Sequence, residues 1–209
     1  MIFYDCATAP SPRRARMFIA EKGLRVESRE ISIAKGEQLT PEFRAVNPDA
    51  MLPALEIAPG QVLTENLGIA AYLEARFPEP PLMGRSAEEK GAVMMWNAIA
   101  ETQCGLAVAE ALRNANPHMK DRALPGPENF PQIPELAARG LRRIDLFFDK
   151  LDRHLAGRDF VAGDGFSMAD ITCFVFVDFA RVVKRRVGPA HGDLLRWYES
   201  VKARPSAQA

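Results

Sequence analysis

The sequence is poor in the residues that build disulfide frameworks and metal centres. It has three cysteines and three histidines among 209 residues and no Cys-x-x-Cys pair, which argues against a disulfide scaffold and against a zinc module. No apolar run approaches the roughly 18 residues of a membrane-spanning helix, and the N-terminus lacks the basic flank and apolar stretch of a signal peptide. Lysine plus arginine and aspartate plus glutamate each total 27, so no net charge favours nucleic acid or a membrane as a partner. These absences predict a globular, cytoplasmic protein.

The hydrophobic fraction of 47% is enough for a buried core, and it is arranged in two different patterns. Through residue 77 short strand patterns alternate with helical ones, which predicts an α/β domain with a small mixed sheet. The expected strands are 2–5, 26–33, 54–57 and 62–63, and the expected helices are 12–22, 40–46 and 65–77. Ser11 is expected to cap the first of these helices and Thr64 the last, because a hydroxyl there can accept from helical N–H groups.

A proline-rich stretch separates this part from a second one, in which every strong pattern is helical. Residues 78–86 are interpreted as a linker, because prolines at 78, 80 and 81 cannot continue a helix. The helices expected after it are 87–114, 134–155, 167–183 and 192–203, with a proline-rich loop over 115–134. The predicted organisation is an α/β domain at 1–77, a linker at 78–86 and an all-helical bundle at 87–209.

A capping box is expected in the second part. Ser167 and Asp170 have the spacing at which a hydroxyl and a carboxylate cap each other's backbone N–H groups. The residues that follow are apolar on nearly every side, so this helix is predicted to lie at the centre of its domain, where water cannot cap it. We interpret the motif as structural and assign it no catalytic role.

Two patterns in the first part are candidates for binding. Pro53 follows Leu52 at a bend before a strand, and a cis bond there would leave the N–H and C=O of Leu52 free to pair with an extended peptide. An ordinary trans turn is the alternative. Glu65 and Asn66 stand at a helix start, where the first can accept from an ammonium group and the second can donate to a carboxylate. An amino-acid head group fits between them, although a solvated helix cap has the same composition.

In their order and spacing these motifs resemble those of the cytosolic glutathione transferases. The resemblance covers residues 1–204 and includes the segments 10–16, 20–24, 41–43, 47–48 and 160–164. It implies a thioredoxin-like N-terminal domain, an all-helical C-terminal domain and a two-fold homodimer. The segment at residues 9–14 is most similar to the corresponding segment of a bacterial and fungal branch of the family, whose members have an atypical catalytic residue.

The resemblance implies glutathione as the co-substrate. The residues that it assigns to glutathione are Gln38, Lys35, Leu52, Pro53, Glu65 and Asn66. The backbone of Leu52 would pair with the cysteinyl part, and the acidic-polar pair at the helix start would hold the γ-glutamyl group. Asn66 departs from the serine that is usual there but keeps a donor. Met51 replaces a lysine that often meets the glycine carboxylate, so Gln38 and Lys35 are expected to hold that end instead.

The group that stabilises the glutathione thiolate is expected at the start of the first helix. A free thiol has a pKa of about 8.5, so a donor at a helix N-terminus is needed to favour S⁻. By the resemblance, Ser11 stands where some members keep a catalytic cysteine, and Ala9 stands where others keep a serine. Ser11 is therefore the catalytic candidate. A backbone amide, or a water held by the helical domain as in the yeast member of the branch, is the alternative, and Tyr4 and Cys6 are further candidates.

The resulting prediction is a detoxifying glutathione transferase that directs the thiolate at a small hydrophobic electrophile. One alternative is a glutathione-dependent peroxidase or disulfide reductase, which would need a reactive cysteine such as Cys6. Another is a non-catalytic binding protein of the same fold, which the departures at Met51 and Asn66 favour.

Overall fold

The computed structural model describes residues 1–208, which form two compact units. The first comprises Met1–Pro80 together with Pro125–Asn129, and the second comprises Pro81–Leu124 and Phe130–Gln208.

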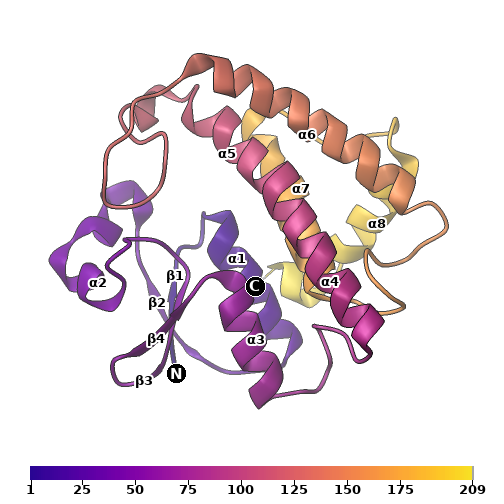
Figure 1. Ribbon diagram of the computed structural model, residues 1–209, viewed down its shortest axis with the longest axis horizontal. Coiled ribbons are helices and arrows are strands. Elements are labelled where there is room, and N and C mark those ends of the chain that lie inside the picture. Colours follow the sequence, from indigo (N-terminus) through magenta and orange to yellow (C-terminus); the bar gives the residue numbers. More distant parts are fainter. Residues whose placement is uncertain (209) are drawn as a thin grey trace. The chain divides into compact units, whose positions relative to one another are not determined.

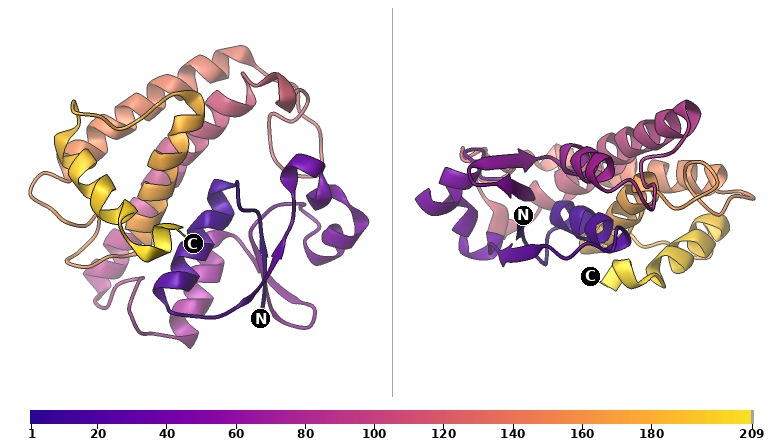
Figure 2. Two further views of the ribbon diagram at one scale, coloured as in Figure 1. Left: turned by 180° about the vertical axis from the view of Figure 1, so that it is seen from behind. Right: turned by 90° about the horizontal axis from the view of Figure 1, so that it is seen from below.

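A four-stranded mixed sheet forms the centre of the first unit. Its strands are β1 (Ile2–Asp5), β2 (Glu27–Glu30), β3 (Ala54–Ala58) and β4 (Gln61–Thr64), in the order β2-β1-β3-β4. β1 is parallel to β2 and antiparallel to β3, and β3 forms an antiparallel hairpin with β4. Helices α1 (Pro10–Glu21) and α3 (Asn66–Arg76) pack together on one side of the sheet, and α2 (Pro41–Val46) lies on the other, as Figure 1 and Figure 2 show. The predicted α/β fold with a mixed sheet is confirmed.

Burial in this unit follows the sequence pattern. Phe3, Leu55, Phe18 and Leu73 are buried in its core, which is why the apolar positions of these strands and helices recur on one face. The outer strand β2 is exposed along its whole length and carries three charged side chains, which oppose pairing with the edge of another sheet.

The strand register brings four separate segments to one end of the sheet. Asp5 pairs with Glu30, Tyr4 with Ala54, and Ala54 with Thr64. Residues 6–11, 31–38, 52–53 and 65–66 therefore all leave or enter the sheet at the same end, which we call the loop end.

The N-cap residues of α1 and α3 are not the ones that the sequence predicts. Ala9 is the N-cap of α1 and makes no side-chain cap, because the helix already begins at Pro10 and Ser11 lies within its first turn. Thr64 is the last residue of β4, and the N-cap of α3 is Glu65, again without a side-chain hydrogen bond. The predictions that Ser11 and Thr64 cap these helices are wrong, and both helix starts keep N–H groups that no cap side chain satisfies.

A buried lysine fixes the beginning of the proline-rich stretch. The Lys22 side chain is fully buried at the end of α1, pairs with Glu74 at 2.5 Å and donates to the carbonyls of Phe77 at 2.8 Å and Pro80 at 2.5 Å. Three oxygen acceptors match the three donors of the ammonium group, which makes its burial tolerable.

The second unit is entirely helical in its long elements, which confirms the predicted fold class. Its helices are α4 (Ala87–Ala100), α5 (Leu106–Arg113), α6 (Pro134–His154), α7 (Met168–Phe179) and α8 (Gly192–Lys202). α4 packs on α7, α5 on α6, and α8 on both α6 and α7. As predicted, α7 is the central helix: ten of its twelve residues are buried.

The helix predicted over 87–114 is interrupted. A π-helical stretch, Glu101–Gly105, joins α4 to α5. At its start the Thr102 hydroxyl donates to the Ala98 carbonyl at 2.7 Å, so a side chain occupies an acceptor of the regular backbone ladder. Gly105 faces the Phe176 ring so closely that a Cβ atom there would stand 2.7 Å from it. The wide turn and the glycine together allow the close approach of the ring.

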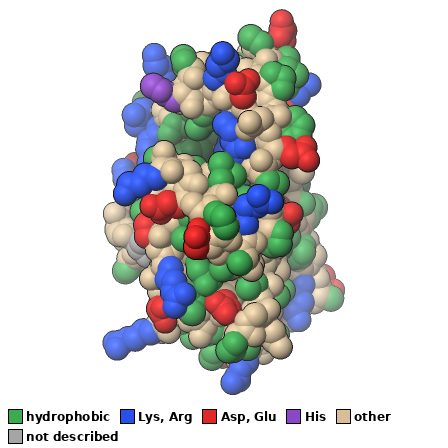
Figure 3. Space-filling model, turned by 90° about the vertical axis from the view of Figure 1, so that its left-hand side faces the viewer, with side chains coloured by type: hydrophobic (Ala, Val, Ile, Leu, Met, Phe, Trp, Pro, Cys, Tyr) green, Lys and Arg blue, Asp and Glu red, His purple; other side chains and the backbone are tan. Residues whose placement is uncertain are grey.

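None of the helices in the described part of the chain combines the length and the apolar character needed to cross a bilayer. The same residues contain no group of three or more histidine, cysteine, aspartate or glutamate side chains that could hold a metal ion. Acidic and basic side chains are interspersed over the face shown in Figure 3, in keeping with their equal numbers in the sequence.

Candidate functional site at the loop end of the sheet

The loop before β3 presents free backbone groups. The Leu52–Pro53 bond is cis, as the resemblance implies, and within residues 1–208 neither the N–H nor the C=O of Leu52 has a hydrogen-bond partner. Asn47 holds the loop: its side chain is buried, its Nδ2 donates to the Met51 carbonyl at 2.9 Å, and its Oδ1 accepts from the Asp49 N–H at 3.1 Å. The half-buried Leu52 backbone can therefore pair with an added extended strand.

The start of α3 combines a strained residue with an unpaired one. Glu65 has φ +59° and ψ 133°, which is unfavourable for a residue with a Cβ atom, and its side chain is exposed. Asn66 is 5% exposed, and its Oδ1 atom has no hydrogen-bond partner among the described residues. A buried amide oxygen without a partner is costly in a closed core, and so it indicates a place for an absent donor.

Gln38 presents the same feature from the segment after β2. It is 8% exposed in a short 3-10 helix, Glu37–Leu39, and its Oε1 atom has no partner among residues 1–208. Lys35 lies three residues earlier with an exposed side chain, which can swing over the surface. The register thus brings the predicted ligands Gln38, Lys35, Leu52, Pro53, Glu65 and Asn66 to one end of the sheet.

The first turn of α1 offers a single free amide. Pro10 and Pro12 have no N–H group, and the Arg13 N–H is bonded to the Ala9 carbonyl at 3.3 Å. Only Ser11 is left to donate from this turn, and within the described chain neither its N–H nor its hydroxyl has a partner. The positive end of the helix dipole is therefore presented through Ser11, which suits a thiolate or another anion.

The two further candidates are engaged elsewhere or shielded. The Tyr4 hydroxyl donates to Glu56 Oε2 at 3.1 Å, and burial, followed by that carboxylate, raises the pKa of Tyr4. Cys6 is 2% exposed, and its Sγ lies 3.6 Å from the Thr8 hydroxyl. Ser11 is thus the best placed of the side chains that the sequence singles out.

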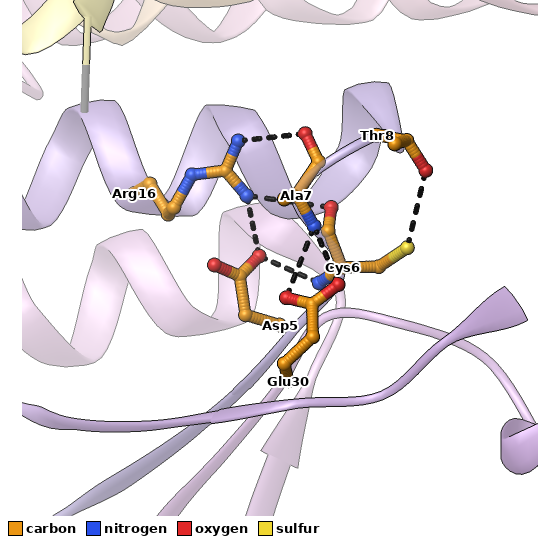
Figure 4. A network of polar contacts seen from close by, with 6 residues as sticks. All are labelled: Asp5, Cys6, Ala7, Thr8, Arg16 and Glu30. Atoms are coloured by element: carbon orange, nitrogen blue, oxygen red, sulfur yellow. Dashed lines mark hydrogen bonds and ion pairs between the residues drawn. The ribbon is translucent and has the colours of Figure 1, made fainter.

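The sequence patterns do not predict the roles of several residues that shape this end. Asn47 orders the loop before Pro53, and Arg16, Asp5 and Glu30 hold the turn between β1 and α1 (Figure 4). The signal for Asn47 is the Asn-Pro pair that precedes the bend. The contact of Glu30 depends on the pairing of β1 with β2, and those of Arg16 depend on how α1 folds back beside the end of β1, so no local pattern reveals them.

Comparisons with known proteins agree with this arrangement. Residues 3–81 match the family model described as "Glutathione S-transferase, N-terminal domain", and residues 134–200 match "Glutathione S-transferase, C-terminal domain". The chain is 35% identical to glutathione S-transferase 2 of Saccharomyces cerevisiae, over 100% of this chain and 88% of that protein.

Solved structures with the same architecture cover the whole chain. The structure of Gtt2 from Saccharomyces cerevisiae has a TM-score of 0.90 and 33% identity, covering 100% of this chain and 99% of the other. A glutathione S-transferase domain-containing protein from Marinobacter aquaeolei has a TM-score of 0.89 and 33% identity, covering 99% of both chains.

Proposed function

Because the chain belongs to the glutathione S-transferase family, we propose that it binds glutathione at the loop end of its thioredoxin-like domain and stabilises the thiolate for attack on a small hydrophobic electrophile. The observation that carries the proposal is the pair of buried, unpaired amide oxygens on Gln38 and Asn66, at the end of the sheet where the Leu52 backbone is also free. Such atoms are costly unless a ligand completes them.

Each part of the tripeptide has a counterpart of fitting chemistry. The Leu52 N–H and C=O pair with the cysteinyl backbone as an added strand does. Glu65 and Asn66 take the γ-glutamyl head group, since a carboxylate accepts from its ammonium and an amide can both donate and accept. Gln38 and Lys35 take the glycyl end: the unpaired Gln38 Oε1 accepts from the glycyl N–H, and the Gln38 amide NH2 and the Lys35 ammonium donate to the carboxylate, to which Met51 offers neither a charge nor a donor.

Thiolate stabilisation is assigned to Ser11. Its N–H is the free amide of a helix start flanked by two prolines, and its hydroxyl is unpaired within residues 1–208. A charge-assisted hydrogen bond from either group favours S⁻ over SH and lowers the thiol pKa. With chlorodinitrobenzene the thiolate forms a bond to the ring carbon and chloride leaves.

The proposal includes a homodimer that acts in detoxification in the cytoplasm. Met94 and Met95 on α4 and Leu106 on α5 are large apolar side chains that are 44%, 52% and 56% exposed. A second copy that covers them would remove this apolar surface from water. Disulfide or peroxide reduction by Cys6 is disfavoured, because its thiol is buried.

Calorimetry with glutathione tests the binding part of the proposal. We expect Asn66→Ala and Gln38→Ala each to weaken binding roughly tenfold, the loss of one buried hydrogen-bonded contact. Gln61→Ala, which removes an exposed amide from β4, is the matched control and should bind as the wild type does. Absence of wild-type binding at millimolar glutathione would overturn the proposal and favour a non-catalytic member of the family.

Conjugation of chlorodinitrobenzene tests the catalytic part. Ser11→Ala removes the hydroxyl and keeps the N–H. A large loss of kcat at unchanged glutathione affinity assigns thiolate stabilisation to the hydroxyl. A wild-type rate removes the hydroxyl from that role and leaves the amide or a bound water.

A further inference from the structure

The turn between β1 and α1 is held by an arginine from the helix that follows it (Figure 4). Arg16 Nη1 donates to Asp5 Oδ1 at 2.5 Å and to the Cys6 carbonyl at 3.3 Å, and its Nη2 donates to the Ala7 carbonyl at 3.3 Å. A guanidinium group presents five donors in a planar fork and can serve three acceptors in this way, whereas a lysine ammonium is a compact point charge.

The N–H groups of Cys6 and Ala7 are bound by two carboxylates, those of Asp5 and Glu30. Glu30 ends β2 directly beside Asp5, and both of its carboxylate oxygens accept from the Ala7 N–H, at 3.1 and 3.2 Å. Asp5 Oδ1 accepts from the Cys6 N–H at 2.7 Å. All four backbone polar groups of Cys6 and Ala7 are therefore bound by charged side chains.

The backbone groups of this turn do not need three charged side chains to be hydrogen-bonded. Ala7 and Thr8 are exposed, so water could reach the polar groups of the turn. Glu30 is exposed, and ordering its long side chain at the surface costs conformational entropy and contributes little stability, whereas the Asp5 and Arg16 side chains, 7% and 16% exposed, form a largely buried pair. Together with the hydrogen bond that the Ala9 N–H donates to the Cys6 carbonyl at 3.0 Å, the arrangement fixes the path of the chain from Cys6 to Ala9, the N-cap of α1, two residues before Ser11.

We propose that Arg16, Asp5 and Glu30 are positioning residues of the thiolate site, which hold the β1–α1 turn and thereby set the place of the Ser11 donors. This inference rests on the proposed function and deepens it. A hydrogen-bond donor acts on a thiolate only at close range and good alignment, so a small shift of the turn weakens thiolate stabilisation more than it weakens binding of the tripeptide.

Glu30→Ala is the first test, with Glu27→Ala as its matched control. Both glutamates are exposed residues of β2, but Glu27 lies at the opposite end of the strand and pairs with Arg29. We expect Glu30→Ala to lower kcat roughly tenfold and to shift the pH profile of kcat/KM toward a higher thiol pKa, with glutathione affinity within about twofold of wild type. Glu30→Gln retains an acceptor for the Ala7 N–H and should recover most of the rate.

Arg16→Met is the second test, with Arg25→Met as its control, since Arg25 is exposed. The ultraviolet absorbance of the bound thiolate is followed at each pH, because a loss of stability alone leaves that titration unchanged. If both Glu30→Ala and Arg16→Met titrate and turn over as the wild type does, the network is structural only and the inference fails. If the wild type itself shows no bound thiolate, the proposed function fails, and this inference fails with it.

Discussion

Two helix N-termini in this chain are built in opposite ways. At α7 the buried Asp170 carboxylate accepts from the Val161 N–H at 2.8 Å, the Trp197 indole at 3.0 Å, and both the N–H and hydroxyl of Ser167 at 3.0 Å. At α3 the N-cap Glu65 is strained and makes no cap, and the next side chain has an unpaired buried oxygen. The chain itself satisfies the polar groups of the first end, whereas the second keeps an unpaired buried oxygen, which we propose glutathione completes. Comparing the two ends therefore separates effects on stability from effects on binding.

Removing the Asp170 carboxylate at the start of α7 should reduce stability more than any other change proposed here. Asp170→Ala leaves the Val161 N–H, the Trp197 indole N–H and the Ser167 N–H without their acceptor in the interior. We expect the free energy of unfolding to fall by at least about 3 kcal/mol. Urea titration measures this loss. A variant of near wild-type stability would show that water replaces the carboxylate and that the end is not closed.

The pH dependence of stability tests the role of Asp170 independently. Burial raises the pKa of Asp170 from its ordinary value of 3.8 to about 6, although its four donors oppose the shift. The folded state then binds more protons than the unfolded chain between these two values. The stability that protonated Asp170 contributes is present below about pH 4 and is lost as the pH rises through about 6.

Unfolding of the wild type and of Asp170→Asn should be compared from about pH 4 to pH 7. We expect the difference in unfolding free energy, wild type minus variant, to fall by about 2–3 kcal/mol over this range. A difference that rises instead would mean that the four donors hold Asp170 ionised throughout.

The serine of the same capping box should contribute less than its carboxylate. Ser167→Ala removes one donor to Asp170 and the side-chain half of the cap, and should lower the free energy of unfolding by about 1–2 kcal/mol. The midpoint in urea should shift while the slope stays constant. Ser86→Ala in the exposed capping box of α4 is the comparison, and it should cost less because water can replace that hydroxyl.

The sequence predicts a helix end well where the interactions there join residues close in the chain, and poorly where they join distant segments. The Ser167–Asp170 box spans four residues and is predictable from spacing, as are the cis bond candidate before Pro53 and the polar pair at Glu65. The positive φ of Glu65 is not, because a glutamate carries no signature of that conformation. The convergence of Gln38 and Asn66 arises from strand register between distant segments, which no local pattern encodes.

A substitution of Glu65 at the start of α3 should change the free energy of unfolding least, and it tests most directly whether that helix start serves binding. Glu65→Gly relieves the backbone strain and should raise the free energy of unfolding by about 1 kcal/mol. The same change removes the carboxylate proposed to hold the glutathione ammonium, so the affinity measured by calorimetry should fall.

Lys184→Gly is the matched control for this change, since Lys184 also has a positive φ, +60°, but lies in the helical unit. It should gain stability without any change in binding. If Glu65→Gly binds glutathione as the wild type does, the strained conformation at α3 has no role in the site. If it is less stable than the wild type, the conformation is held by contacts of the Glu65 side chain and is not strain kept for a ligand.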